Sequence, residues 1–422
     1  MDLDTGLFVV GALGVAAVFG SRLLRSVPLT APLLALVTGV VVGPEVLGVA
    51  VLDDGLPILH GASEVAVAIA LMAVALRFPW PTVARLARPV AWITTVGMVA
   101  MAAVVGLLAW WVLDVDPAVA LLVGGVLAPT DPVLSSGFVT GDPATRTLPE
   151  RVRVLLSVES GINDGLALPL VVAGTVLVLD DGVEVFAVEG LLSVLVAVVV
   201  GIAAGSAAGE AFRRLDEAHD VEDSAFFVFT IVLAVLVLGG VNLLDGDGIL
   251  AVFVAGLAYN RQVGETFYEK EREVDEGINR VLILPLFVLF GTLLPWDAWA
   301  DLGAPLVAFA ALVLVLRRPP VVFALRPLLG LDRADAAFYG WFGPMGAAAL
   351  YFATRAHEHQ AAGDVVWPVA AMVVAVSTLV HGVTGTPGRV LYQRTIGERG
   401  DPDTDEEEEA EEAVSPAGRG DE

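Results

Sequence analysis

A short polar cluster, SVESGINDGLALPL, interrupts an apolar segment that is long enough to cross a membrane. Glu159 and Asn163 are four residues apart in it, as are Ser160 and Asp164. On a helix these positions fall within an arc of about 140° and form one polar stripe. Ionisable groups are costly inside a membrane, so the stripe must face the protein interior or water, and it indicates an ion or proton path. A polar network with a purely structural role is the alternative, although such a network rarely needs two carboxylates.

The preceding apolar segment, LLVGGVLAPTDPVLSSGFV, is predicted to be broken in its middle. Pro129 and Pro132 each remove a backbone donor and clash with the turn before them. Thr130 and Asp131 lie between the two prolines. Broken backbone in mid-membrane is tolerated where it lines a cavity, and its carbonyls can coordinate a cation. A simple proline kink is the alternative, but a kink does not need a charged residue.

A second interrupted segment, FYGWFGPMGAAALYFA, contains Gly343 and Pro344 and comes seven predicted spans later. The span after it carries Ser377 and His381, as the span after the first break carries the carboxylates. Matched discontinuous helices in two halves of a chain indicate inverted repeats, with the binding site where the breaks cross.

The elements that hold these residues are predicted to be transmembrane helices. Of 422 residues, 56% are hydrophobic and 17% are charged, whereas a soluble protein is about a quarter charged. Long apolar runs recur along nearly the whole chain, which predicts an all-α polytopic membrane protein. We place about thirteen spans at residues 7–24, 31–50, 57–77, 88–113, 117–139, 150–177, 186–213, 224–243, 248–262, 273–294, 303–325, 335–356 and 365–391.

The loops between these spans alternate in charge, and basic loops mark the cytoplasmic side. The pattern predicts a multi-pass protein of the cell membrane with its amino terminus outside and its carboxyl terminus in the cytoplasm. Residues 1–396 form the transmembrane domain, and the acidic low-complexity run 397–422 is predicted to be a disordered cytoplasmic tail. The chain has 49 acidic and 23 basic residues. This acidic excess argues against nucleic-acid binding and is typical of a protein from a halophile.

The composition also excludes several classes of catalytic and metal sites. The absence of cysteine excludes disulfides, thiol catalysis and cysteine metal sites. The five histidines show no metal-ligand spacing, and we find neither a nucleophile–base constellation nor a paired-aspartate protease motif. We therefore expect neither an enzyme nor a cofactor.

Two arginines, Arg317 and Arg318, lie well inside an apolar segment, LVLVLRRPPVVFAL. They either snorkel to the cytoplasmic interface or stay buried, where they offset the charge of the site or the exposed carbonyl ends of the broken helices. Glu64 is a further candidate for a buried carboxylate, with weaker support.

Taken together, LLALVTGVVVGP, APTDPVLSS, ESGINDGLALPL and FGPMGAAA resemble the monovalent cation:proton antiporters of the sodium/proton exchanger superfamily, of the archaeal or bacterial type. The resemblance covers residues 7–391 and implies the sodium/proton antiporter-like fold, assembled as a homodimer in lipid. It implies that Asp164 carries either the cation or the proton, with Asn163 as its neutral partner. It also implies that Glu159 and Ser160 shape the site, together with the broken helix at Thr130 and Asp131.

Met345 departs from this pattern, because relatives usually carry an arginine there that pairs with the glutamate matching Glu159. Methionine cannot form that pair. Either Arg317 or Arg318 replaces the missing arginine, or Glu159 is protonated.

The expected function is antiport of sodium, or of potassium or lithium, against protons. If one carboxylate, Asp164, holds either a proton or a dehydrated cation, exchange is obligatory when the site alternates between the two membrane faces. Oxygen atoms of Asp164, Asp131, Ser160 and Thr130 suit a small hard cation. Because Asn163 is uncharged, exchange is expected to be electroneutral. A cation channel, a proton-coupled symporter and a sensor that has lost transport are the alternatives.

Overall fold

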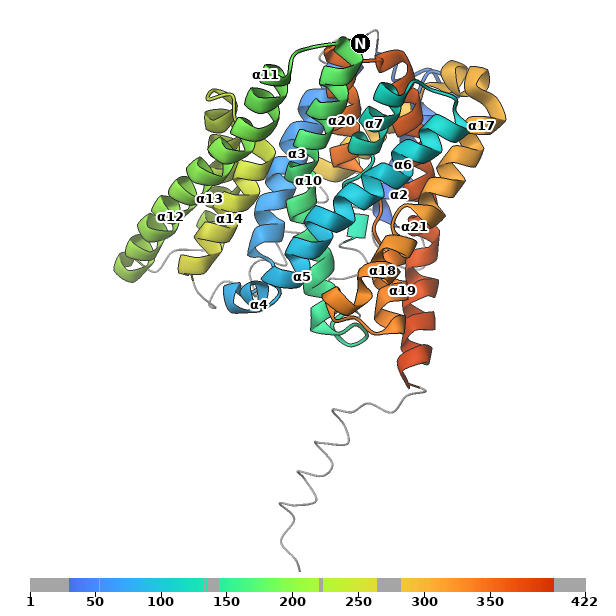
Figure 1. Cartoon of the computed structure of the whole chain (residues 1–422). Helices are drawn as coiled ribbons and strands as arrows, with labels where there is room; N and C mark the ends of the chain where they lie inside the picture. Colours follow the sequence, from blue (N-terminus) through green and yellow to red (C-terminus); the bar gives the residue numbers. More distant parts are fainter. Residues whose placement is uncertain are drawn as a thin grey trace, which may run out of the picture.

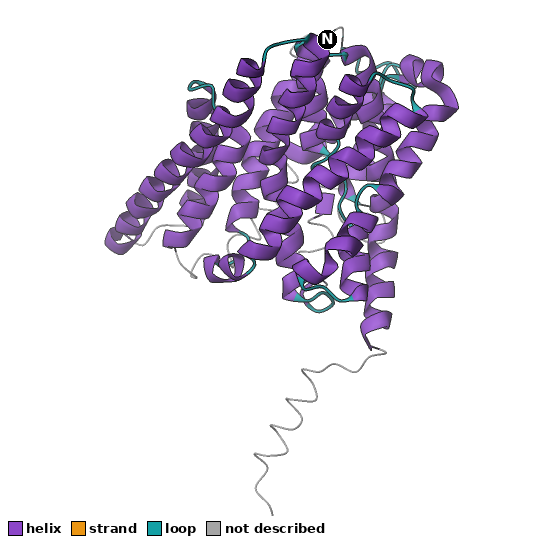
Figure 2. Ribbon diagram, in the orientation of Figure 1, coloured by secondary structure: helices purple, strands orange, loops and turns teal. Residues whose placement is uncertain are grey.

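The computed structural model describes residues 30–52, 54–131, 134–135, 144–219, 223–263 and 282–397. Within these ranges every regular element is a helix, which confirms the all-α prediction (Figure 2). Six of the described helices are long and apolar enough to cross a membrane. The predicted first span at 7–24, the beginning of the predicted span 273–294, the end of the predicted span 117–139 and the predicted tail beyond Gly397 lie outside the described residues.

The bundle is built from helices whose backbone polar groups are satisfied within each segment, as a membrane interior requires. In chain order they are α2 (Ala31–Val42), α3 (Leu56–Leu76), α4 (Trp80–Arg85), α5 (Ala87–Trp92), η1 (Ile93–Gly97), α6 (Met98–Val112), α7 (Pro117–Val126), α10 (Glu150–Leu179), α11 (Val183–Val185), η2 (Phe186–Leu192), α12 (Ser193–His219), α13 (Asp223–Asn242), α14 (Gly248–Val263), α16 (Leu284–Thr292), α17 (Trp296–Leu316), α18 (Pro319–Leu329), α19 (Arg333–Trp341), α20 (Ala347–Glu358) and α21 (Gly363–Gly397).

Helices α12, α13 and α14 gather on one side of the bundle and α17, α18, α19 and α21 on the other, with α3 and α10 between them (Figure 1). Small residues allow these helices to approach closely. A side chain at Gly174 of α10 would place its Cβ 2.5 Å from the Cα of Leu122 in α7, and one at Gly205 of α12 would overlap the carbonyl of Ala255 in α14. Helix α10 is thus held tightly against α7, the helix that leads into the first break.

Both predicted breaks are present. Helix α7 ends at Val126 and leaves the chain non-helical as far as Asp131, while α19 ends at Trp341 and α20 begins at Ala347. The two breaks cross, because the backbone N–H of Asp131 donates to the carbonyl oxygen of Pro344 at 2.8 Å. The crossing lies inside the bundle and brings together segments from the two halves of the chain.

Several predicted spans differ in extent from the observed helices, and prolines explain two of the differences. Helix α2 ends at Val42, before the predicted end at residue 50, because Gly43 and Pro44 follow it. The predicted span 303–325 is interrupted between α17 and α18 at Arg317 and Arg318. The cause is the Pro-Pro pair that follows, which is compatible with the start of a helix but not with its interior.

Candidate functional site

Asp164 lies in the middle of α10 and is 1% exposed. Its Oδ1 atom is buried and has no hydrogen-bond partner among the described residues. A carboxylate without a partner is expensive to keep as an anion away from water. A bound proton or a bound cation would remove that cost.

The other polar groups around Asp164 are satisfied by one another. Asn163 donates through Nδ2 to Oγ1 of Thr130 at 2.8 Å and accepts the backbone N–H of Thr130 at 3.1 Å through Oδ1. The hydroxyls of Thr130 and Ser160 are 2.9 Å apart. These bonds fix the polar face of α10 against the first break, so the structure brings together the residues that the sequence singled out.

Asp131 accepts backbone N–H groups from both sides of the crossing, including one at the start of α20. Its Oδ1 accepts the backbone N–H of Leu134 at 2.9 Å, and its Oδ2 accepts the N–H of Ala347 at 2.7 Å. A carboxylate at an N-terminus satisfies an unpaired donor and interacts favourably with the helix dipole. Asp131 therefore joins the two breaks, whereas Asp164 keeps an oxygen without a hydrogen-bond partner among the described residues.

Glu159 is fully buried and paired. Its two carboxylate oxygens accept from Nη1 and Nη2 of Arg318 at 2.5 and 2.7 Å, and the hydroxyl of Tyr339 donates to it as well. Arg318 is itself 2% exposed and donates through Nε to the carbonyl of Tyr339 at 3.1 Å. Of the two candidate arginines, Arg318 is therefore the one that pairs with Glu159. Because its side chain is buried, the alternative that it snorkels to the interface is wrong.

Arg317 bonds to backbone carbonyl groups, whereas Arg318 bonds to the carboxylate of Glu159. Nη1 of Arg317 donates to three carbonyl oxygens at the start of the first break, just after α7, at 2.9, 3.0 and 3.1 Å; they belong to Leu127, Ala128 and Pro129. Its Nη2 donates to the carbonyl of Gly343 in the second break at 2.6 Å. Carbonyl ends of helices carry partial negative charge, which a buried guanidinium offsets. Arg317 stabilises both breaks from their carbonyl side, as Asp131 does from their N–H side.

Met345 takes part through its backbone. It is 1% exposed, and its N–H donates to Oγ of Ser377 at 2.9 Å. Gly343 is required beside it, because a Cβ there would overlap the side chain of Arg318. Pro132, the second proline of the first break, lies outside the described residues.

Tyr339 is the functional neighbour that the sequence reasoning missed. It lies in α19 and completes the set of donors to Glu159. A single tyrosine in an aromatic-rich apolar stretch carries no signal of its own, because only the fold shows that α19 faces α10.

Gly346→Ala tests the crossing. A Cβ at this position would overlap Oδ2 of Asp131 and displace it from the N–H of Ala347. We expect the free energy of unfolding in detergent to fall by about 1–3 kcal/mol. Gly240→Ala in α13 is the matched control, since nothing lies within 4 Å of a Cβ there, and it should keep or slightly raise stability. Equal behaviour of the two variants would contradict the close approach.

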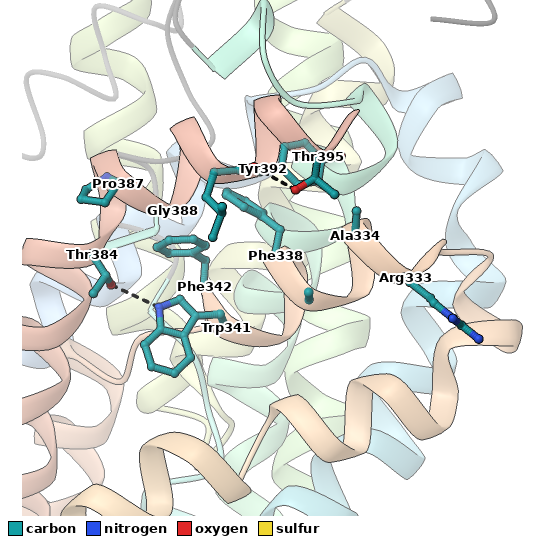
Figure 3. Close-up of a pocket in the computed structure, with 12 residues that line it drawn as sticks. Arg333, Ala334, Phe338, Trp341, Phe342, Thr384, Pro387, Gly388, Tyr392 and Thr395 are labelled. Carbon is teal, nitrogen blue, oxygen red and sulfur yellow. Dashed lines mark hydrogen bonds between the residues drawn. The ribbon is translucent and has the colours of Figure 1, made fainter. Parts of the chain in front are cut away.

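A separate apolar pocket of about 580 Å³ lies between α19 and α21 (Figure 3). Phe338 and Trp341 from α19, with Phe342 just after it, face Thr384 and Tyr392 from α21 across the pocket. The described residues that line this pocket include no carboxylate. In this respect its described lining differs from the crossing of the breaks, where Asp131 and Asp164 lie.

Comparison with known proteins decides the family. The sequence model described as "Sodium/hydrogen exchanger, transmembrane" matches residues 10–388. This chain belongs to the sodium/hydrogen exchanger family. Its resemblance to monovalent cation:proton antiporters, read from the motifs, is thereby confirmed.

Relatives of this exchanger-family chain include transporters from yeast and bacteria. It is 29% identical over 297 residues to Na⁺/H⁺ antiporter 2 of Zygosaccharomyces rouxii, covering 62% of this chain and 37% of that protein. It is 26% identical over 391 residues to the K⁺/H⁺ antiporter NhaP2 of Shewanella oneidensis, covering 92% and 67%. The chain thus spans little more than a third of the yeast relative.

The fold matches a solved structure over nearly all of both chains. The sodium proton antiporter of Methanocaldococcus jannaschii, solved at pH 8, superposes with a TM-score of 0.72 at 18% identity, covering 92% of this chain and 99% of that one. The match confirms the predicted antiporter-like fold of a multi-pass membrane protein.

Proposed function

We propose that this chain exchanges a monovalent cation for a proton across the cell membrane, with Asp164 holding either ion in turn. The observation that carries the proposal is the buried Oδ1 of Asp164, which has no partner among the described residues beside two crossing helix breaks. Because the proton and the cation compete for one carboxylate, the site crosses the membrane loaded with one or the other, and exchange follows.

The neighbours of Asp164 divide into ligands and supports. Ser160 and Thr130 offer hydroxyl oxygens and Asn163 an amide oxygen, which suit a small hard cation. Asp131 and Arg317 support the two breaks from opposite ends. These supports keep the backbone open at the site without leaving its polar groups unpaired.

Orientation and assembly are part of the same proposal. The alternation of loop charge supports an outside amino terminus and a cytoplasmic carboxyl terminus. Resemblance to the family supports a homodimer in lipid, with one part of each protomer moving against the dimer interface.

The test is transport by the purified chain in liposomes. A fluorescent pH indicator inside the vesicles reports proton flux when sodium, potassium or lithium is added outside. We expect cation-driven alkalinisation or acidification, depending on the imposed gradient, with one or more of these ions. Proton movement without a cation requirement, or cation movement without protons, would favour a channel and contradict antiport.

Electroneutral exchange is a separate prediction. Asn163 adds no second titrating charge beside Asp164, and Glu159 is neutralised by Arg318. One cation should therefore move against one proton, and imposing a membrane potential of either sign should leave the exchange rate unchanged. Each uncompensated charge would feel about 2.3 kcal/mol per 100 mV, so a different stoichiometry would show as a strong voltage dependence.

A further inference from the structure

A second polar cavity, of about 570 Å³, lies at the end of the bundle where α14 begins. Its walls come from α3, α10, η2, α12, α20 and the turn between α13 and α14. Leu168, one helical turn beyond Asp164 on α10, also lines it. The charged and titratable side chains of the lining are Glu64, Asp245, Asp247, Arg355, His60, His359 and Tyr351.

Asp247 is the unusual member of this lining. It is 6% exposed, and its Oδ1 accepts the backbone N–H of Leu250 at 2.9 Å, which caps the first turn of α14. Its Oδ2 is buried without a hydrogen-bond partner among the described residues. One oxygen of this carboxylate is therefore structural, while the other has no donor in the wall of the cavity.

The remaining polar groups of the cavity are partly engaged. Oε1 of Glu64 accepts the amide of Asn242 at 2.8 Å, and His60 lies 3.4 Å from Glu358 outside the lining. Asn242 is exposed, so the cavity reaches the surface of the bundle at the end of α13. Three carboxylates against one guanidinium give the lining an excess of negative charge when the histidines are neutral.

The charge on Asp247 changes near neutral pH. Burial raises the pKa of Asp247 to about 7, with the Leu250 N–H and the positive charge of Arg355 opposing the rise and Glu64 adding to it. Asp245, Tyr351, His60 and His359 are the other titratable groups of the lining, and His357 and Glu358 lie nearby on α20. Above pH of about 7 the carboxylate is ionised, and below it the carboxyl is neutral.

We infer that this cavity is an entry vestibule that binds a hydrated monovalent cation through Asp247 before the ion passes along α10 to Asp164. The passage to Asp164 rests on the proposed antiport, whereas binding in the vestibule does not. The described residues contain no group of three or more acidic or histidine side chains that could hold a metal ion directly. The cation accordingly keeps most of its water, and the negative lining raises its local concentration.

The transport test uses Asp247→Asn in liposomes, with the cation supplied to one face at a time. Asparagine remains a good N-cap, so α14 should keep its first turn. About one pH unit above 7, we expect the apparent KM at the Asp247 face to rise roughly three- to tenfold, with the maximal rate and the opposite face unchanged. About one unit below 7 the difference should vanish, because the wild-type carboxyl is then neutral.

Asp114→Asn is the control. Asp114 is exposed in the loop between α6 and α7, has a positive φ that asparagine accepts, and does not line the cavity. It removes the same charge and should leave KM unchanged at both pH values. An equal rise in KM for both variants, or no rise for Asp247→Asn, would overturn the vestibule.

A second measurement does not depend on transport. A hydrophobic carbodiimide reacts with protonated carboxyls in apolar surroundings, and mass spectrometry locates the adduct. In an Asp164→Asn background we expect Asp247 to be labelled near neutral pH, and added sodium but not choline to suppress the labelling. Labelling that sodium leaves unchanged overturns the vestibule even if wild-type exchange is intact. Failure of the wild type to exchange, with sodium protection retained, contradicts only the proposed antiport.

Discussion

Asp164→Asn is expected to reduce cation/proton exchange to the level of protein-free liposomes while the protein remains folded. Asparagine is nearly isosteric but cannot bind a proton or an ion as an anion. The unpartnered Oδ1 of Asp164 makes no bond that the substitution would break. The free energy of unfolding should therefore stay the same or rise, because a buried carboxylate without a partner is costly.

Asp180→Asn is the matched control for this experiment. Asp180 is exposed at the carboxyl end of the same helix and adopts a left-handed conformation, which asparagine also accepts. The Asp180→Asn protein should exchange cations for protons at the wild-type rate. Substantial exchange by folded Asp164→Asn protein would remove Asp164 from the mechanism and shift attention to Glu159 or Asp131.

Arg318→Met is expected to cause the largest loss of stability among single substitutions at the site. It leaves Glu159 buried with only the hydroxyl of Tyr339 as a partner, and an uncompensated buried charge of this kind typically costs about 3–5 kcal/mol. Glu159→Gln combined with Arg318→Met should lose much less, because both charges are then gone. Unfolding of all four proteins in detergent gives the coupling between the pair.

The exposed pair Glu210–Arg213 on α12 serves as the control cycle. Nη2 of Arg213 lies 2.7 Å from Oε2 of Glu210. The two side chains are 47% and 35% exposed, so this ion pair is in contact with solvent. Glu210→Gln and Arg213→Met should therefore combine additively. Coupling near zero for Glu159 and Arg318 as well would mean that Glu159 is held as a neutral acid, and its carboxyl stretch should then appear in infrared spectra.

Local sequence rules predicted the polar stripe and the two breaks. The spacing of Glu159, Asn163 and Asp164 places them near one another on any helix, and Pro129 cannot continue α7. These features depend on residues within about two turns of each other. They can therefore be predicted without knowledge of the tertiary structure.

The division of labour between Arg317 and Arg318 could not be predicted in the same way. The two are adjacent in the chain, and their directions are set where α17 ends and α18 begins. One reaches the carbonyl of Gly343 and the other the carboxylate of Glu159. Which partner each one meets depends on how distant helices pack, and residue type alone does not encode it.

The capping role of Asp131 has the same origin. A charged residue between two prolines suggests a ligand, and the sequence therefore placed it in the cation site. The N–H of Ala347 that it accepts is 216 residues away, and only the crossing brings the two together. When a carboxylate caps a helix in a distant segment, the residues next to that carboxylate in the sequence do not reveal it.

The Glu159–Arg318 pair also has a consequence for biosynthesis, because its members are 159 residues apart. Glu159 enters the membrane while the ribosome is still far from Arg318, and the amino-terminal half is made first. During that interval α10 must keep this carboxyl protonated or in contact with water, since a bare charge in lipid is costly. A nascent chain that stops before α18 presents an unmatched acidic helix. The late helices thus complete the polar interior of the early ones, and neither half of the chain is a finished unit on its own.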